Sequence, residues 1–207
     1  PLQVWRFTRS GTGACRSCGL VGTEGTCGYY ATGTDPENNC GLCRLCDGFG
    51  ACANAANGSD PKNNCPTDAQ STCARDGSCD GLGACRLYSS GMVCEAQSCT
   101  GSTRYLADTC NGAGSCLDAG TQSCSPYLCS GTSCATSCSL DPDCLSGYYC
   151  AGTSCTIKKS GGLACGGANE CQSGFCVDGV CCLSACTGAC RACNVVGFLG
   201  SCTYYTL

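Results

Sequence analysis

Cysteine is the residue that most constrains how this chain folds. Of 207 residues, 31 are cysteine, a density beyond that of most disulfide scaffolds. Leucine, isoleucine, valine and phenylalanine together number only 27, so crosslinks must supply stability that a small apolar core does not. No helical periodicity of useful length is present. The sequence predicts a small disulfide-rich, all-β fold, an elongated string of short β-hairpin and knottin-like modules with almost no helix.

Disulfides at this density need an oxidising compartment, so we expect a secreted, extracellular protein at a cell surface. No apolar run is long enough to span a membrane. The net charge is −4, with no basic cluster, which argues against nucleic acid and anionic lipid as partners. The chain begins with Pro1 and carries no signal peptide, as expected of a processed or truncated chain.

A stretch near the start of the chain, residues 14–30, returns near its end as residues 189–205. Ten of the 17 positions are identical at a constant offset of 175. Such a repeat indicates a piece of a tandem array or a protomer with equivalent modules at both ends, and both favour end-to-end extension. Symmetry predicts equivalent disulfide partners for the cysteines of the two copies, Cys15, Cys18 and Cys27 in the first and Cys190, Cys193 and Cys202 in the second.

Thirty-one is an odd number, so at least one cysteine is free, bonded to another chain or bonded outside this segment. By the symmetry of the two copies, we expect it where the two ends differ. Adjacent Cys181 and Cys182 should bond different partners, because a ring between neighbours strains the peptide. The cysteines singled out as disulfide-forming are Cys15, Cys18, Cys27, Cys46, Cys52, Cys79, Cys85, Cys110, Cys116, Cys181, Cys182, Cys190, Cys193 and Cys202.

Two apolar segments are candidate subunit contacts. Thr-Glu in the first copy of the repeat becomes Phe198-Leu199 in the second, and an exposed apolar pair in a glycine-flanked loop favours a contact. The cysteine-free arm, residues 1–13, contains Val4, Trp5 and Phe7, which suit a strand added to a neighbouring subunit. A frayed or locally docked terminus is the alternative. We predict that one of these segments meets the next subunit in a head-to-tail filament.

Between the two copies, short motifs indicate turns. The loops 33–40 (GTDPENNC) and 58–65 (GSDPKNNC) combine Asp-Pro with Asn-Asn, in which proline presets the backbone and asparagine tolerates left-handed conformations. The pattern Cys-Asp/Asn-Gly-x-Gly-x-Cys occurs at 46–52, 79–85 and 110–116 and predicts hairpins closed by tight primed turns. Neither a lysine nor a following helix supports a phosphate cradle there.

These patterns divide the chain into five predicted segments. They are an extended arm at 1–13, cysteine-rich modules at 14–93, a looser linker module at 94–134, a knot-like module at 135–182 and the second copy of the repeat at 183–207.

The motifs Cys79–Cys85, Cys110–Cys116, Ser125–Cys134, Asp141–Cys150, Glu170–Cys182 and Ala185–Asn194 together resemble the tandem cysteine-rich repeats of large proteins secreted by myxobacteria and related bacteria. The resemblance covers nearly everything after Ala14. It implies a secreted, repetitive, surface-associated protein without a well-defined activity. In spacing only, the knot-like module is also similar to the cysteine-rich domains of Dickkopf proteins.

Metal and redox motifs are the strongest rival signal. Cys40, Cys43 and Cys46 form Cys-x-x-Cys-x-x-Cys, but the fourth ligand of an iron–sulfur motif is not in place. The pairs 15/18 and 40/43 are separated by 21 residues, close to zinc-ribbon spacing. Calcium would need a denser run of Asp or Asn ligands. We therefore predict no metal and no cofactor.

Histidine is absent, which removes the commonest acid–base group. The carboxylate pairs Asp35/Glu37, Asp76/Asp80 and Asp141/Asp143 stand beside Pro or Gly and indicate solvated turn acids. We predict that the protein is not an enzyme.

Glycans are the remaining candidate partner. In each Tyr-Tyr pair, 29/30, 148/149 and 204/205, one ring is expected to pack on a disulfide and the other to face outward, where it could stack on a glycan or another subunit. Asn57-Gly58-Ser59 is a glycosylation sequon. The sequence thus favours a structural subunit of an extracellular fibre that binds further copies of itself. The alternatives are an adhesive or glycan-binding surface module and a spacer within a longer repeat protein.

Overall fold

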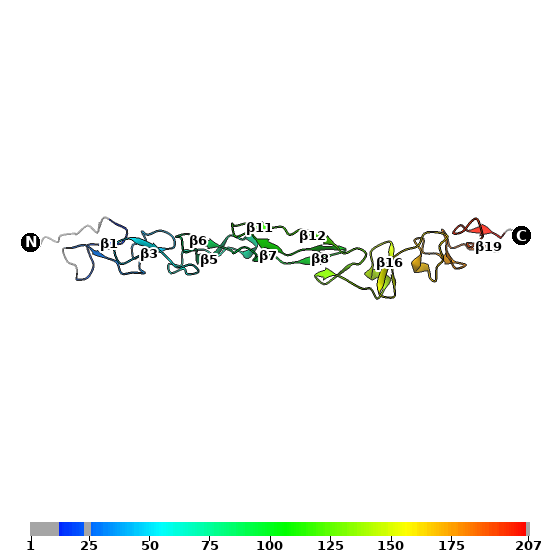
Figure 1. Cartoon of the computed structure of the whole chain (residues 1–207), viewed down its shortest axis with the longest axis horizontal. Helices are drawn as coiled ribbons and strands as arrows, with labels where there is room; N and C mark the ends of the chain where they lie inside the picture. Colours follow the sequence, from blue (N-terminus) through cyan, green and yellow to red (C-terminus); the bar gives the residue numbers. More distant parts are fainter. Residues whose placement is uncertain (1–12, 23–25, 206–207) are drawn as a thin grey trace, which may run out of the picture. The chain divides into compact units, whose positions relative to one another are not determined.

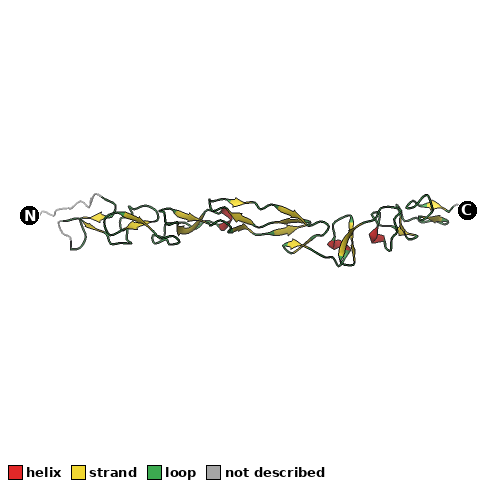
Figure 2. Ribbon diagram, viewed as in Figure 1, coloured by secondary structure: helices red, strands yellow, loops and turns green. Residues whose placement is uncertain are grey.

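The computed structural model describes residues 13–22 and 26–205 and confirms a disulfide-rich all-β fold built from short antiparallel hairpins (Figures 1 and 2). Within these ranges the helices are three single 3₁₀ turns, η1 (Gln70–Thr72), η2 (Asp141–Asp143) and η3 (Ala168–Glu170). No helix in the described part of the chain could cross a membrane. The chain divides into two compact units, Pro1–Glu95 with Asp108–Asp118 and Ala96–Ala107 with Ala119–Leu207. Residues 94–134 therefore contribute to both.

The first unit contains three two-stranded hairpins and one three-stranded sheet of order β11-β10-β7. The hairpins are β1 (Arg16–Ser17) with β2 (Gly28–Tyr29), β3 (Arg44–Cys46) with β4 (Cys52–Asn54), and β5 (Arg75–Cys79) with β6 (Cys85–Leu87). The sheet consists of β7 (Val93–Glu95), β10 (Asp108–Cys110) and β11 (Cys116–Leu117).

The second unit contains a three-stranded sheet of order β12-β9-β8 followed by four hairpins. The sheet consists of β8 (Ser98–Thr100), β9 (Thr103–Tyr105) and β12 (Thr121–Ser123). The hairpins are β13 (Cys129–Ser130) with β14 (Ser133–Cys134), β15 (Tyr148–Ala151) with β16 (Ser154–Ile157), β17 (Cys176–Val177) with β18 (Val180–Cys181), and β19 (Arg191–Ala192) with β20 (Thr203–Tyr204).

Fourteen of the fifteen disulfides follow one rule, in which four cysteines form a module and the first bonds the third while the second bonds the fourth. The additional bond joins Cys18 to Cys27. The modules, numbered 1 to 7 and given by their cysteines in order, are Cys15, Cys40, Cys46 and Cys52; Cys43, Cys65, Cys79 and Cys85; Cys73, Cys94, Cys110 and Cys116; Cys99, Cys124, Cys129 and Cys134; Cys138, Cys144, Cys150 and Cys155; Cys165, Cys171, Cys176 and Cys181; and Cys182, Cys186, Cys193 and Cys202.

Modules 1 to 4 interleave along the sequence. The first cysteine of each of modules 2 to 4 (Cys43, Cys73 and Cys99) lies between the second and third cysteines of the module before it. Modules 5 to 7 follow one another without overlap. Adjacent Cys181 and Cys182 bond different partners, Cys171 and Cys193, as predicted.

In modules 1 to 6 the third and fourth cysteines face each other across a hairpin. The tight primed turns predicted for the Asp/Asn-Gly-x-Gly motifs occur instead in the shorter loops, such as Asp178-Gly179, where both residues have positive φ (+51° and +77°). The Asp/Asn-Gly-x-Gly loops are longer and are closed by a backbone hydrogen bond, for example from the Asp47 N–H to the Ala51 carbonyl at 2.9 Å.

Sulfur forms the core of the protein. In the described part of the chain, the largest fully buried side chains are all cysteines. Within module 1, the Sγ atoms of Cys15 and Cys40 lie 3.2 Å apart, and in module 2 those of Cys43 and Cys65 do the same. The two disulfides of each of these modules therefore pack on one another. They form the buried core that the few aliphatic side chains do not provide.

Candidate functional site

The repeated sequence folds into the same hairpin twice. We call residues 14–22 and 26–30 the first hairpin and residues 189–205 the second. Arg16 pairs with Tyr29 and Arg191 with Tyr204, and in both copies the guanidinium lies over the tyrosine ring, at 5.1 and 4.5 Å from its centroid. The Tyr30 N–H donates to the Cys15 carbonyl at 3.1 Å, and the Tyr205 N–H donates to the Cys190 carbonyl at 3.0 Å.

Module 1 covers the first hairpin. Cys15 is fully buried and bonds Cys46, and Tyr30 packs on the cluster that these two cysteines form with Cys40. Gly50 lies directly against the ring of Tyr29, since a Cβ there would come within 2.6 Å of the ring. Its φ of +97° also favours glycine.

The same contact, a glycine loop packed on a cross-strand pair that includes an arginine, also joins module 2 to module 1 and module 3 to module 2. Arg44 pairs with Asn54 and Arg75 with Leu87, each partner standing two residues after the fourth cysteine of a module. We call each such Arg with its cross-strand partner a platform; the others are Arg16–Tyr29 and Arg191–Tyr204. Gly83 stands two residues before Cys85, the fourth cysteine of module 2, and a Cβ there would lie 2.9 Å from the Asn54 Oδ1. Gly114 stands two residues before Cys116, the fourth cysteine of module 3, and a Cβ there would lie 3.7 Å from the Leu87 Cδ1. Each platform of modules 1 and 2 therefore receives a glycine loop of the module that follows.

Among the described residues, no glycine loop of this kind covers the second hairpin. Every cysteine lies in the described residues, and Cys190 alone is free; it is exposed. Tyr205 is 58 % exposed, whereas its counterpart Tyr30 is half-buried; Tyr204 is 59 % exposed and its counterpart Tyr29 49 %. Cys190 has a φ of +61°, a left-handed conformation also found at Cys43 (+49°), Cys73 (+56°) and Cys186 (+46°).

The expectation of equivalent partners in the two copies is therefore corrected, and Cys190, singled out as disulfide-forming, has no disulfide partner among the cysteines of this chain. In the second hairpin, Cys193 bonds Cys182 and Cys202 bonds Cys186. Cys190 lies between the second and third cysteines of module 7, the place that the first cysteine of a following module takes elsewhere. No such module has its remaining cysteines in this sequence.

In the first hairpin, Cys18 and Cys27 bond each other. The upstream partners available in the second copy have Phe7 and Gly11 at the corresponding places of the first. The copies thus differ in partners that lie before the repeat. The odd cysteine stands at one of the identical positions, contrary to the prediction.

The remaining predicted disulfide cysteines are all bonded, each as a member of modules 1 to 3, 6 or 7 or in the Cys18–Cys27 bond. The motif Cys40-x-x-Cys43-x-x-Cys46 supplies three different disulfides and marks the place where modules 1 and 2 interleave. Disulfide sulfur is not the thiolate that binds metals.

The predicted contact residues Phe198 and Leu199 are 58 % and 54 % exposed. The backbone of their loop packs on Gly161 and Gly162, just before module 6, because a Cβ on Gly200 would come within 2.3 Å of the Gly162 nitrogen. The arm residues Val4, Trp5 and Phe7 lie outside the described residues.

The two Asp-Pro loops are braced by their own aspartates, and both contain an asparagine with positive φ, as the sequence predicts. Asp35 is not the solvated acid expected, since its side chain is 1 % exposed and Lys62 Nζ lies 2.6 Å from its carboxylate. Burial alone would raise the pKa of Asp35, but hydrogen bonds from Lys62 and from the N–H groups of Asn39 and Cys40 outweigh it and lower that pKa.

The glycine loops are braced in the same way. Asp47 Oδ1 accepts from the N–H groups of Phe49 (2.7 Å) and Ala51 (3.0 Å), and Asp80 and Asn111 make the corresponding pairs of bonds. These backbone donors lower the pKa of Asp47 and of Asp80. These aspartates stabilise the backbone of their own loops, and Asn111 makes the same hydrogen bonds without a charge.

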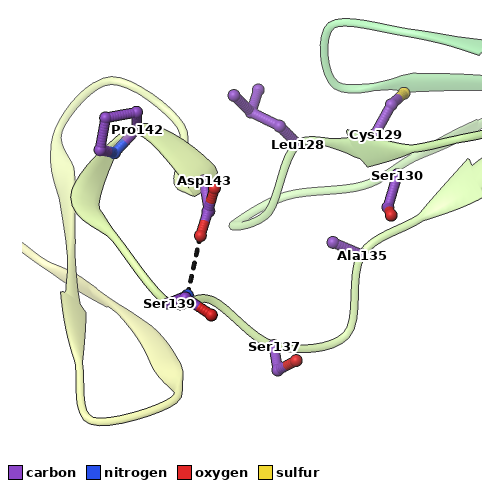
Figure 3. Close-up of a pocket in the computed structure, with 8 residues that line it drawn as sticks. All are labelled: Leu128, Cys129, Ser130, Ala135, Ser137, Ser139, Pro142 and Asp143. Atoms are coloured by element: carbon purple, nitrogen blue, oxygen red, sulfur yellow. Dashed lines mark hydrogen bonds between the residues drawn. The ribbon is translucent and has the colours of Figure 1, made fainter.

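A hollow of about 280 Å³ lies where η2 approaches β13 (Figure 3). Asp143 is the only acid or base among its eight lining residues. Its Oδ2 accepts from the N–H groups of Ser139 (2.7 Å) and Leu140 (2.9 Å), which lower its pKa. The carboxylate is thus held ionised and already bonded, so this hollow offers no acid–base pair.

The candidate glycan positions are accessible. Asn57 is exposed, and its Oδ1 accepts from Arg86 at 3.2 Å. Of the tyrosine pairs, 29/30 divides as predicted into an exposed and a packed ring, whereas both rings of 204/205 are exposed. Tyr149 is buried.

Fold and site together define a disulfide-rich all-β protein of hairpin modules, in which a terminal hairpin carries an exposed thiol beside an uncovered platform. No protein-family model, curated protein or solved structure matches the chain.

Proposed function

We propose that this protein is a structural subunit of an extracellular, disulfide-stabilised fibre or surface appendage that assembles head to tail and performs no catalysis. The observation that carries the proposal is the overlap of its disulfide-closed loops. The loops 15–46, 43–79, 73–110, 99–129 and 124–134 leave no residue between Cys15 and Cys134 outside a closed ring.

This overlap limits how far the chain extends under load. The shortest covalent path from Cys15 to Cys134 crosses four disulfides and only 25 backbone steps. At about 3.4 Å per residue and about 5.5 Å per disulfide, it reaches about 110 Å, against about 400 Å for the reduced chain. A segment locked in this way resists unravelling even when its hydrogen bonds break, which suits a fibre.

The exposed Phe198 and Leu199 supply a non-covalent contact to the next subunit, and contacts of this heterologous kind grow filaments when they do not close. The resemblance to secreted cysteine-rich repeat proteins and the oxidised cysteines support a cell-surface location.

Electron microscopy of native, unreduced material tests the proposal. We expect filaments with an axial repeat of one chain. Phe198→Ser with Leu199→Ser should reduce assembly, whereas Leu140→Ser, a change of an exposed leucine in η2's flank, should not. Dispersed single particles from native material would contradict the fibre.

The exposed rings of Tyr204 and Tyr205 favour a second candidate, an adhesive module that stacks on polysaccharide. A glycan-array signal without self-association would replace the fibre by this function. A passive spacer would show neither property.

A further inference from the structure

Cys190 and the platform Arg191–Tyr204 belong to one hairpin and are both uncovered. We propose that this hairpin supplies Cys190 as the first cysteine of a further four-cysteine module whose other three cysteines belong to a partner segment, and that Cys190 bonds the third cysteine of that module. The inference rests on the proposed function and names the chemistry of the partner at this end of the subunit.

Two observations support this role for Cys190. Its counterpart Cys15, at an identical position of the repeat, bonds the third cysteine of module 1. Its place between the second and third cysteines of module 7 is that of Cys43, Cys73 and Cys99, each of which bonds the next module.

The platform specifies what the partner must contain. Tyr29 accepts only glycine at position 50, because a Cβ there would come within 2.6 Å of the ring. Tyr204 occupies the same position of the same hairpin. The partner must therefore present Cys-Asp/Asn-Gly-x-Gly-x-Cys, with its second glycine over Tyr204 and its first cysteine, the third of the module, at Cys190.

Formation of this bond is an oxidation that needs an acceptor. The Cys190 thiolate attacks the disulfide of an oxidised thiol–disulfide carrier, forming a mixed disulfide and releasing one carrier thiol. The thiolate of the partner cysteine then displaces the second carrier thiol. Two protein thiols lose two protons and two electrons, and the carrier disulfide becomes a dithiol.

The test compares residues 1–207 produced alone in an oxidising compartment with native material. Unreduced protein is treated with a maleimide, digested and mapped by mass spectrometry. We expect Cys190 to be labelled in the chain produced alone, with Cys190→Ser as the unlabelled control. In native material we expect it unlabelled and bonded to a cysteine followed by Asp-Gly or Asn-Gly.

A Cys190 that is labelled in native material, or that bonds any other kind of cysteine, overturns the inference. Tyr204→Ala should lower the yield of the Cys190 bond at least threefold in the source cells, whereas Tyr105→Ala, which alters another exposed tyrosine, should not. If Tyr204→Ala has no effect, the bond needs only a reactive thiol, and the proposal that the Arg191–Tyr204 platform receives the partner is wrong.

The mapping also separates this inference from the fibre. A partner cysteine on another chain supports both. A partner on the same polypeptide, with single particles by microscopy, supports the bond at Cys190 and contradicts subunit assembly. Filaments that contain free Cys190 support the fibre and contradict the bond at Cys190.

Discussion

The first and second hairpins share ten of 17 residues, the same strand register and the same stacked Arg–Tyr pair. Their surroundings are opposite. Cys15 is buried in a bond to module 1, whereas Cys190 is exposed and free. Because the second hairpin keeps its form without a bond at Cys190, that bond is not needed to fold the hairpin. The cysteine at this position serves the junction between modules.

The largest effect is expected from removing the bond at the first junction. Cys15→Ser with Cys46→Ser opens a loop of sequence separation 31, and chain-entropy arguments give a loss of about 3–4 kcal/mol. We expect the opening free energy at the Tyr30 amide, measured by native-state hydrogen exchange, to fall by about that amount.

Cys190→Ser is the matched control for this change. It alters the same position of the same hairpin without breaking a bond, so the protection of the Tyr205 amide should remain within about 0.5 kcal/mol of its original value. A loss of several kcal/mol there would show that Cys190 is bonded in the chain, and the contrast between the two hairpins would be lost.

The contact between the glycine loop and the platform should give the next largest effect. Gly50→Ala places a methyl group against the Tyr29 ring and adds the strain of a positive φ, so we expect a loss of about 2–4 kcal/mol at the first junction. Gly33→Ala has a similar φ of +82° but no atom within 4 Å, and strain alone should cost about 1–2 kcal/mol. The two variants are compared by hydrogen exchange at the Tyr30 and Ala51 amides. If Gly50→Ala and Gly33→Ala lose the same stability there, the packing of Gly50 on Tyr29 contributes nothing.

Sequence reasoning predicts the class of fold here because its signals are local. Cysteine density forces a disulfide core, and Asp-Gly and Asp-Pro motifs place turns whose chemistry needs only neighbouring residues. The two braced Asp-Pro loops, with their left-handed asparagines, follow directly from such signals.

The pairing of cysteines is not local, and this is where the prediction for Cys190 fails. In the second copy, Cys193 and Cys202 bond Cys182 and Cys186, which precede the repeat. The first copy has Phe7 and Gly11 at the corresponding places, so the same cysteines there must bond other partners. The signal that could have located the odd cysteine is the interleaving itself. At Cys43/Cys46 the first cysteine of module 2 stands three residues before the third cysteine of module 1, and Cys190 stands at the same spacing before Cys193, the third cysteine of module 7.

Acid should weaken the glycine loops of modules 1 and 2. Backbone donors lower the pKa of Asp47 and Asp80 in the folded state. Their contribution to stability is therefore complete above the unfolded value of about 3.9 and is lost as the pH falls through the folded pKa. We expect the amide proton shifts of Ala51 and Ala84 to titrate in that window, and that of Ser115, braced by Asn111, to stay constant. A Ser115 shift that titrates in parallel would point to global acid unfolding.

The smallest expected effect concerns the platforms themselves. Arg16→Gln and Arg191→Gln each remove a guanidinium stacked on a tyrosine, worth about 0.5–1 kcal/mol at exposed sites. Because this pair lies within each hairpin, the losses measured at the Tyr30 and Tyr205 amides should be equal, whether or not a module covers the ring. If the loss in the first hairpin exceeds that in the second by more than about 1 kcal/mol, the platform acquires its strength from the covering module. The second hairpin would then not be preformed to receive one.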